Sequence, residues 1–277
     1  MNGRYALAAA AMLAALPASA QEAAAPKPGS DPLVVSLSPY AWATSLDGHV
    51  GVRGYRAKMN MDFQDIIDDL NGALMLEADF RKGAFQLVLN SVFAQLEDSA
   101  ASARGRVSVK AKVNEFIQDA YAGYWVGGFA LKEGGWAWEE RDSGAENRIA
   151  LMPYGGIRYT YLDSEVDGKL DLERLGRTER RTVSGSQQWA APIAGVRANI
   201  RLGGAWELMV QGDGGGLSND NYTWQGMGVL GYRFGLGGSV TGYALAGYRY
   251  LDQNYVDGGF EWDVTTKGPV VGLTIQF

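Results

Sequence analysis

Charged side chains recur at alternate positions along much of this chain, and acids and arginines share one parity. In ALMLEADFR, Glu77, Asp79 and Arg81 alternate with apolar residues. The full set is Glu77, Asp79, Arg81, Asp119, Arg158, Arg197, Arg201, Glu207, Asp213, Arg233 and Arg249. Buried charges must be paired, so a set this nearly balanced can form an interlocked network of ion pairs. Alternatively, the set can line a narrow polar passage whose excess of arginine mildly favours anions.

A second candidate chemistry centres on His49, the one histidine of the chain. Asp47 precedes it by two residues, and this Asp-x-His spacing is of the kind used by barrel proteases of the omptin type. No second acidic pair stands at a matching site. A lipid deacylase or phospholipase would pair a histidine with a serine, and the spacing nominates no serine. We therefore assign no catalytic residue.

The segment MDFQDIIDDL predicts a short amphipathic helix that packs over or into the mouth of the fold. Asp62 is a good N-cap, and apolar residues follow at helical spacing. They are Phe63, Ile66, Ile67 and Leu70. Asp65, Asp68 and Asp69 could bind a divalent cation, but aspartates at such positions more often face solvent, and no EF-hand spacing is present. With one histidine and no cysteine, we expect neither a metal nor a cofactor.

Ten segments show the period-two alternation of strands with one apolar face. They are residues 33–46, 72–82, 85–98, 111–126, 149–164, 187–202, 205–214, 221–235, 239–252 and 268–277. Each is about as long as the 9–11 residues that a tilted membrane strand needs, or longer. The last segment reaches the final residue, which predicts that it pairs with the first strand and closes the sheet.

The connections between these segments alternate in length. The connections KG (82–83), GGA (203–205) and GLGG (235–238) read as tight glycine turns, whereas residues 47–71, 99–110, 165–186 and 253–267 read as longer polar loops. Short turns at one rim and long loops at the other are typical of outer-membrane β-barrels. Residues 127–148 are an exception, read either as a long excursion at the short-turn rim or as a further hairpin around WAWEE.

A short repeat, Pro-x-x-Gly-aliphatic, recurs within three of the segments. It begins at Pro153, Pro192 and Pro269. Because proline has no N–H to donate to a sheet, these positions are predicted to be strand starts or bulges.

The charged parity must face the inside of such a barrel, because a charge on the lipid face costs about 2–4 kcal/mol at mid-bilayer. The eleven charged residues are therefore predicted to line the lumen. Leu273, Ile275 and Phe277 lie on the opposite parity and resemble the C-terminal signal by which outer-membrane barrels are recognised for insertion.

The N-terminus reads as an export signal. Arg4, a short apolar stretch and the small residues Ala18-Ser19-Ala20 are typical of a cleaved signal peptide over residues 1–20. Residues 21–32 read as a flexible leader and residues 33–277 as the barrel. The acidic balance and the lack of a basic patch argue against nucleic acid.

The sequence also resembles a group of small, largely uncharacterised, porin-like outer-membrane β-barrel proteins of proteobacteria. The similarity is carried by QGDGGG, by Ser218 with TWQ at 223–225, and by GYR at 231–233 and GYRYLD at 247–252. SPYAWATSLDGHVGV and the stretch from DFQDIIDDL onward match too, whereas residues 127–186 depart from the pattern. This resemblance implies an outer-membrane barrel and carries over no substrate or catalytic residue.

Together these features predict a closed antiparallel up-and-down barrel in the bacterial outer membrane, with ten strands and with eight or twelve as alternatives. The expected function is non-enzymatic: a narrow porin-like channel for small polar solutes, or a structural or surface barrel with a salt-bridged lumen. An outer-membrane enzyme acting on lipid or peptide at the extracellular rim is the rival. The expected partners are outer-membrane lipid, lipopolysaccharide and, during insertion, the barrel-assembly machinery, with the protein itself a monomer.

Overall fold

The computed structural model describes residues 31–52, 55–101, 107–132, 135–139, 147–172 and 177–277. The predicted signal peptide, and all of the predicted leader except residues 31 and 32, lie outside the described residues. The elements are β1 (Leu33–Trp42), β2 (Ser45–Val52), β3 (Tyr55–Met61), α1 (Phe63–Asp69), β4 (Leu70–Lys82), β5 (Phe85–Ala101), β6 (Val107–Tyr124), β7 (Val126–Lys132), β8 (Gly135–Glu139), β9 (Asn147–Leu172), β10 (Arg177–Gly203), β11 (Trp206–Ser218), β12 (Asn221–Gly237), β13 (Val240–Asp257) and β14 (Phe260–Gln276).

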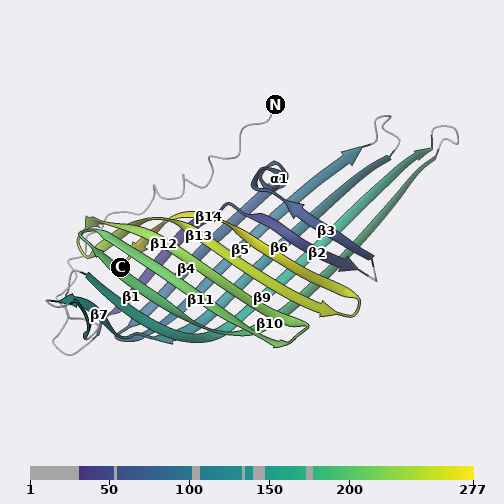
Figure 1. Ribbon diagram of the computed structural model, residues 1–277. Helices are drawn as coiled ribbons and strands as arrows, with labels where there is room; N and C mark the ends of the chain where they lie inside the picture. The colour runs from purple at the N-terminus through teal and green to yellow at the C-terminus, as the bar shows by residue number, and fades with distance from the viewer. Residues whose placement is uncertain (1–30, 53–54, 102–106, 133–134, 140–146, 173–176) are drawn as a thin grey trace.

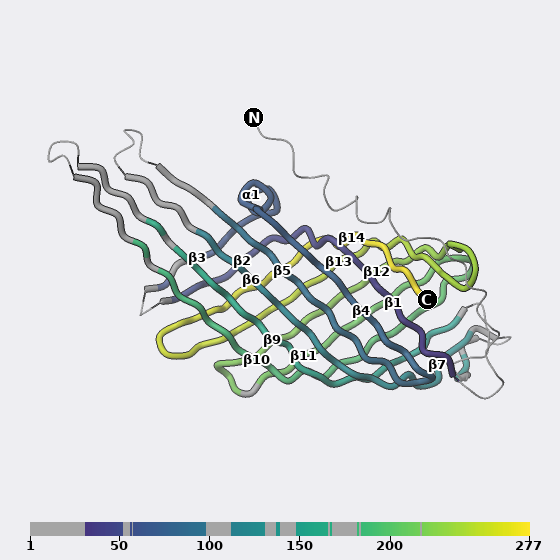
Figure 2. The backbone as a smooth tube through the Cα atoms, turned by 180° about the vertical axis from the view of Figure 1, so that it is seen from behind, coloured from purple at the N-terminus to yellow at the C-terminus, as the bar shows by residue number. Residues whose placement is uncertain are grey.

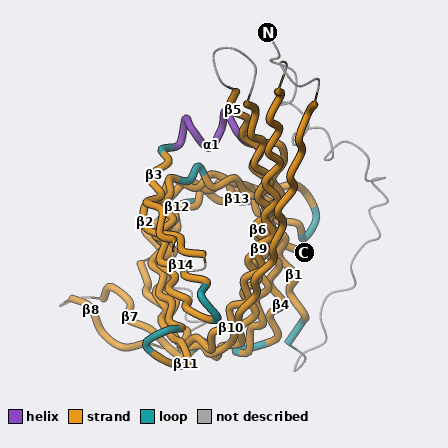
Figure 3. Tube along the Cα trace, turned by 90° about the vertical axis from the view of Figure 1, so that its right-hand side faces the viewer, coloured by secondary structure: helices purple, strands orange, loops and turns teal. Residues whose placement is uncertain are grey.

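The described strands close into an antiparallel barrel of ten (Figures 1 and 3). The order around the wall is β1, β4, β5, β6, β9, β10, β11, β12, β13, β14 and back to β1. Closure is made by β1 and β14, with Ser36 opposite Gln276 and Trp42 opposite Val270. The predicted ten-stranded closed barrel is thus confirmed, and the last strand does pair with the first.

One position in the wall is shared by β1 and β2. β1 pairs with the end of β14, and β2 pairs with its beginning, over Phe260–Lys267. Between them, the Ala43 N–H donates to the Pro269 carbonyl at 2.9 Å, so the ladder is continuous. β3 folds back onto β2 and adds no strand to the closed wall. The twelve-stranded alternative is therefore wrong, although residues 49–52 and 55–60 do lie in strands.

The three predicted glycine turns lie at one end of the barrel. Gly83, Gly204 and Gly238 have φ of +59°, +57° and +58°, the left-handed region that glycine adopts without strain. The hairpin of β7 and β8 lies at the same end, and β8 contains GWAWE, so the hairpin interpretation of residues 127–148 is confirmed. By the pattern of bacterial barrels this is the periplasmic end.

The long connections at the other end are mostly strand, which corrects their prediction as loops. β9 and β10 pair without a register break from Asn147 opposite Leu202 to Leu172 opposite Arg177. β5, β6, β9 and β10 run well beyond their neighbours at this end (Figure 2). The physical reason is a reversal of polarity along the strands. In the membrane the outward side chains are apolar because they contact lipid. Above the membrane the outward side chains contact water, and apolar side chains point inward. The alternation that predicted each strand therefore changes phase at this level, although the strand itself continues.

The outer wall of the membrane segment is apolar. Leu87, Leu89, Ile157, Val196, Val210 and Leu273 are exposed on it. Aromatic pairs lie near both edges: Trp206 with Tyr232, and Trp224 with Tyr250, with ring centroids 4.9 and 4.5 Å apart. Trp224 and Tyr232 are eight residues apart on β12, about 26 Å along the strand and about 20 Å along the axis of a barrel tilted by ~40°. That spacing matches the apolar band of outer-membrane barrels, about 25 Å.

The three repeat prolines lie inside long strands, so their prediction as strand starts or bulges is wrong. Pro153 and Pro192 stand within the unbroken ladder of β9 and β10, and Pro269 lies mid-strand in β14. All three side chains are exposed on the outer wall. A proline removes a single ladder donor, and ladders on both sides of the strand hold the backbone in place.

The predicted helix is present as α1. Asp62 caps it by accepting hydrogen bonds from the N–H groups of Gln64 and Asp65, at 2.8 and 3.1 Å, and the Asp65 carboxylate accepts from the Asp62 N–H at 3.0 Å. No helix in the described part of the chain is long and apolar enough to cross a membrane.

Two neighbouring glycines of the wall offer a matched test of close strand packing. A Cβ added at Gly247 would lie 2.2 Å from the Gly228 carbonyl oxygen, whereas one added at Gly228 would meet nothing within 4 Å. Gly247→Ala is expected to destabilise the barrel by about 1–3 kcal/mol, the usual cost of overpacking. Gly228→Ala is expected to change stability by less than about 0.5 kcal/mol. The temperature at which the folded gel band disappears measures both, and equal shifts would contradict this packing.

Candidate functional site

A buried arginine on β9 is the hub of the barrel interior. Arg158 is 1% exposed and donates to both oxygens of Asp119, at 2.7 and 3.1 Å. It also lies 3.1 Å from Asp213 and donates to Thr223 at 2.9 Å. The bidentate geometry and the second carboxylate satisfy a guanidinium that burial would otherwise penalise heavily.

A second arginine reaches across the lumen. Arg249 on β13 lies 3.4 Å from Asp119 on β6, and these strands stand on opposite sides of the barrel. It donates to Gln225 at 3.0 Å and to Tyr40 at 3.2 Å, and its guanidinium lies 4.6 Å from the centre of the Trp42 ring. Opposite walls are therefore tied together through one carboxylate.

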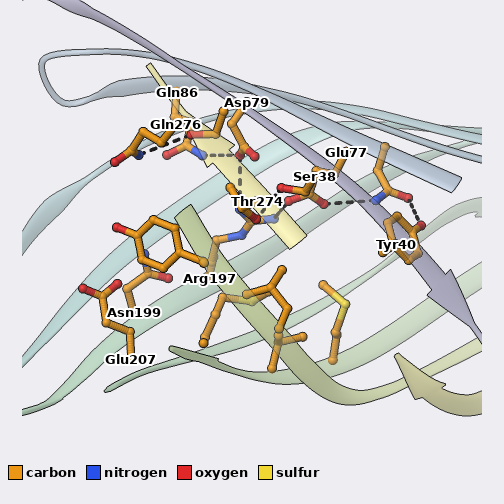
Figure 4. Close-up of a pocket in the computed structure, with 18 of the residues that line it drawn as sticks. Ser38, Tyr40, Glu77, Asp79, Gln86, Arg197, Asn199, Glu207, Thr274 and Gln276 are labelled. Carbon is orange, nitrogen blue, oxygen red and sulfur yellow. Dashed lines mark hydrogen bonds and ion pairs between the residues drawn. The ribbon is translucent and has the colours of Figure 1, made fainter. Parts of the chain in front are cut away.

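A third arginine forms a neighbouring group of ion pairs, shown in Figure 4. Arg197 on β10 lies 3.2 Å from Glu77 and 3.4 Å from Asp79, both on β4. It also donates to Gln211 at 2.9 Å and to the Tyr121 hydroxyl at 2.5 Å. β4 and β10 are not neighbours, so this group too crosses the lumen.

Amides and tyrosines join the two groups. Asn90 donates to Glu77 at 3.0 Å and accepts from Arg249 at 3.3 Å. Tyr154 donates to Asp213 at 2.9 Å, and its ring lies 4.4 Å from that of Tyr121. We call the joined set, Glu77, Asp79, Asp119, Arg158, Arg197, Asp213 and Arg249, the central network.

An apolar cluster fills the interior on the long-hairpin side of the central network. It comprises Leu46, Ile66, Leu162, Trp189, Trp262 and Val264, with Tyr255 and Phe260 packed against it. The Trp189 and Tyr255 rings stack with centroids 4.7 Å apart. Ile66 comes from α1, so the helix contributes a side chain to this apolar cluster; Figure 3 shows the helix at the rim. The interior is therefore not the uniformly polar lumen that the charged parity suggested.

Above the membrane, charges lie on the outside. Arg56 on β3 donates from Nε to Glu261 on β14 at 2.7 Å. This hydrogen bond and the negative charge of Glu261 raise the pKa of Arg56 above its ordinary value.

Open space remains on the short-turn side of the central network. A cavity of about 220 Å³ lies directly below Arg197, Glu77 and Asp79. A wider space of about 470 Å³ at the mouth is lined by Arg81, Arg148, Arg201, Arg233 and Glu207, among others. Figure 4 shows Arg197, Glu77 and Asp79 among the residues that line the inner cavity.

The eleven predicted residues divide into two sets. Seven form the central network, and Arg81, Arg201, Glu207 and Arg233 lie at the mouth. Arg201 and Glu207 are 3.9 Å apart and partly exposed, and the Arg81 guanidinium lies 5.9 Å from the centre of the Trp125 ring. Arg233 is exposed and stands apart from the central network.

Sequence reasoning missed the uncharged partners and one acid. Tyr121, Tyr154, Gln211 and Asn90 complete the central network, and Glu115 is a half-buried acid whose Oε1 is buried without a hydrogen-bond partner among the described residues. Parity could have found Tyr121 and Glu115, because both stand an even number of residues from Asp119. Tyr154 and Gln211 also share the parity of Arg158 and Asp213, and all of these residues were left out because the charged side chains alone defined the set.

The candidate catalytic and metal-binding residues are not assembled into a site. Asp47 and His49 are exposed, on the parity opposite to the inward Leu46, and His49 lies across from Lys58 and Asp263. Asp65 serves the cap of α1, and Asp68 accepts a hydrogen bond from Gln64 at 3.0 Å. Within the described ranges, no three His, Cys, Asp or Glu residues are grouped so as to hold a metal ion.

Comparison with solved structures supports the fold. The chain is similar to the outer-membrane protease OmpT from Escherichia coli, with a TM-score of 0.52 and 10% identity over 88% of this chain and 97% of that one. This chain has the fold of a bacterial outer-membrane barrel. That fold, with its apolar outer band, places it in the outer membrane. At this identity the likeness extends to the fold alone.

Two further solved structures align with lower TM-scores. Ail of Yersinia pestis aligns with a TM-score of 0.31 and 11% identity over 88% of this chain and 98% of that one. A FadL homologue of Pseudomonas aeruginosa aligns with a TM-score of 0.29 and 10% identity over 88% of this chain and 89% of that one. No protein-family model and no curated protein matches the sequence, so membership of the small proteobacterial group stays a prediction.

Loss of Arg158 should lower the free energy of unfolding far more than loss of an ion pair at the mouth. Arg158→Ala leaves Asp119 and Asp213 short of a buried partner and is expected to cost about 3–5 kcal/mol. Arg201→Ala removes a partly exposed pair and is expected to cost about 0–1 kcal/mol. Urea-dependent folding into lipid vesicles, followed by tryptophan fluorescence, measures both. Similar losses for the two variants would show that the hub is not what stabilises the interior.

Proposed function

We propose that this chain is a non-enzymatic, sealed outer-membrane barrel: a membrane scaffold that carries a projecting sheet above the bilayer. The observation that supports it best is the central network, whose side chains bridge opposite walls of the barrel. A porin-like channel needs a continuous aqueous path, whereas at this level Arg197 and Arg249 reach carboxylates on strands that are not their neighbours.

The apolar cluster around Trp189 and Ile66, which we call the outer seal, supports the same proposal at a second position along the barrel axis. Apolar side chains, including large aromatics, fill the interior beneath α1. An ion crossing there would lose its hydration without gaining polar partners. Beyond this apolar cluster, β5, β6, β9 and β10 continue as a projecting sheet. This sheet could contact other molecules at the cell surface.

Membrane lipid and lipopolysaccharide are the proposed surroundings of the outer wall, and a monomer is the proposed state. Insertion by the barrel-assembly machinery is proposed to use the C-terminal signal. Of its residues, Leu273 and Phe277 are exposed on the outer wall and Ile275 is half-buried.

Conductance in a planar bilayer tests the seal. The refolded protein is expected to give no discrete steps, while heat-dependent gel migration shows that the barrel is intact. An open porin refolded in the same way is the control for insertion. Discrete, salt-dependent steps would overturn the proposal. In that case Arg197→Glu with Arg233→Glu should reverse the ion preference of the channel.

The absence of enzymatic activity is tested separately. OmpT is a protease, and its fold is shared, but the outward position of His49 gives no base-and-nucleophile pair here. The purified barrel is expected to hydrolyse neither peptides nor phospholipids. Hydrolysis by the wild type that is lost in His49→Ala would instead support the enzyme at the extracellular rim.

A further inference from the structure

The apolar face of α1 is only partly covered by the protein. Ile66 is 7% exposed and packs in the apolar cluster inside the barrel. Phe63 and Ile67, by contrast, are 44% and 46% exposed. Residues four apart in a helix are neighbours on its surface, so these two side chains form one apolar patch beside Ile66. The helix therefore presents one apolar side chain to the interior of the barrel and two to its surroundings.

The next side of α1 is polar. Gln64 donates to Asp68 at 3.0 Å across one turn of the helix, and both side chains are exposed. They lie about 100° around the helix from Phe63 and Ile67, because each residue turns an α-helix by ~100°. α1 contains acids and no lysine or arginine, so electrostatic attraction to anionic headgroups would not hold it against a membrane. Contact with a membrane would have to be made by the apolar patch.

α1 stands beside the upper edge of the lipid-facing wall. Figures 1 and 2 show it projecting from the side of the barrel where β4 begins. Leu74, on the outer face of β4, is 68% exposed and lies opposite Phe93 of β5. Two residues above Phe93 the outer face becomes polar: Gln95 accepts a hydrogen bond from Asn71 at 3.4 Å and donates to Asn114 at 2.7 Å. The apolar outer surface therefore ends close to the helix.

The distance from Leu74 to the helix fits the depth of a membrane surface. α1 ends at Asp69, and β4 begins at Leu70, four residues before Leu74. Four strand residues span about 13 Å, which is about 10 Å along the axis of a barrel tilted by ~40°. Interfacial helices bury their apolar face about 5–10 Å deep at the boundary between headgroups and acyl chains. The patch is thus within reach of the leaflet that contacts Leu74.

We propose that α1 is an interfacial helix whose patch of Phe63 and Ile67 lies in the outer leaflet of the surrounding bilayer, among acyl chains just below the headgroups. Ile66 fixes the same helix to the apolar cluster, so α1 joins the upper interior of the barrel to the membrane surface. The side that carries Gln64 and Asp68 faces water. The inference rests on the position of the barrel in the outer membrane and not on a closed lumen, so a conducting barrel would leave it standing.

Single-cysteine spin labels test this placement, because the chain contains no cysteine of its own. Phe63→Cys and Ile67→Cys are labelled and refolded into vesicles of dioleoylphosphatidylcholine, which carry no net charge. Electron paramagnetic resonance measures collisions of each label with oxygen, which concentrates in hydrocarbon, and with a water-soluble nickel complex. Both labels are expected to favour oxygen over nickel several-fold more than a label at Gln64→Cys, the matched control on the polar side of the helix.

Labels at Leu74→Cys and Gln188→Cys are the references for lipid and for water. If the labels at positions 63 and 67 collide with nickel as freely as the label at position 64, the patch lies in water and the proposal is overturned. If they are shielded from both reagents, the proposal is overturned as well. In that case protein covers the patch, either another part of this chain or a second copy.

A measurement on the native side chain keeps the test independent of the label. In lipid nanodiscs, the Ile67 δ1 methyl signal is assigned by its loss in Ile67→Val. It is expected to broaden when the lipid chains carry a nitroxide and to persist with a water-soluble gadolinium complex. The opposite pattern would overturn the proposal. The buried Ile66 methyl group is the internal control and should persist with the gadolinium complex.

Discussion

The structure depends on keeping charged side chains out of contact with lipid. A barrel wall whose outer face is hydrocarbon-compatible must turn every charged side chain inward, and an interior of ten strands is too narrow to hydrate them all. The charges are neutralised by ion pairs in the lumen. Arg158 pairs with Asp119 and Asp213, and Arg249 and Arg197 pair with acids on strands that are far apart along the chain. Pairing of this kind demands simultaneous contacts from many strands. It therefore couples closure of the barrel to the contacts that cross its lumen.

The face of each strand that carries apolar side chains changes along the strand. Within the membrane, the outward residues are apolar and the inward ones polar, as with Val196 beside Arg197. Above the membrane, water replaces lipid and the pattern reverses: Trp189 turns inward while Gln188 is exposed. The upper interior thus packs like the core of a water-soluble protein, and Ile66 of α1 completes it. One continuous ladder spans both environments because backbone pairing is indifferent to which face is apolar.

The interior on the short-turn side of the barrel differs from the central network and from the apolar cluster above it. Among the described residues it holds an inner cavity of about 220 Å³ and a wider space of about 470 Å³ at the mouth. The charged set defined by parity is consequently not one functional group. Its seven inner members stabilise the interior by mutual pairing. Arg81, Arg201, Glu207 and Arg233 lie where solvent and small molecules can reach them.

The sequence by itself determined the barrel, its ten strands and the capped helix at Asp62, because alternation and capping are local patterns. It also predicts which charges face inward, because a charge on the lipid face is costly. Which of them meet was decided only by the tertiary structure: Asp119 and Arg249 lie on opposite walls, and closure alone brings them together. The extent of the strands was hidden as well, because the pattern near Glu165 and Lys267 reverses where the solvent changes. Parity specifies a face, and the position of a residue along the barrel axis depends on the register of all the strands together.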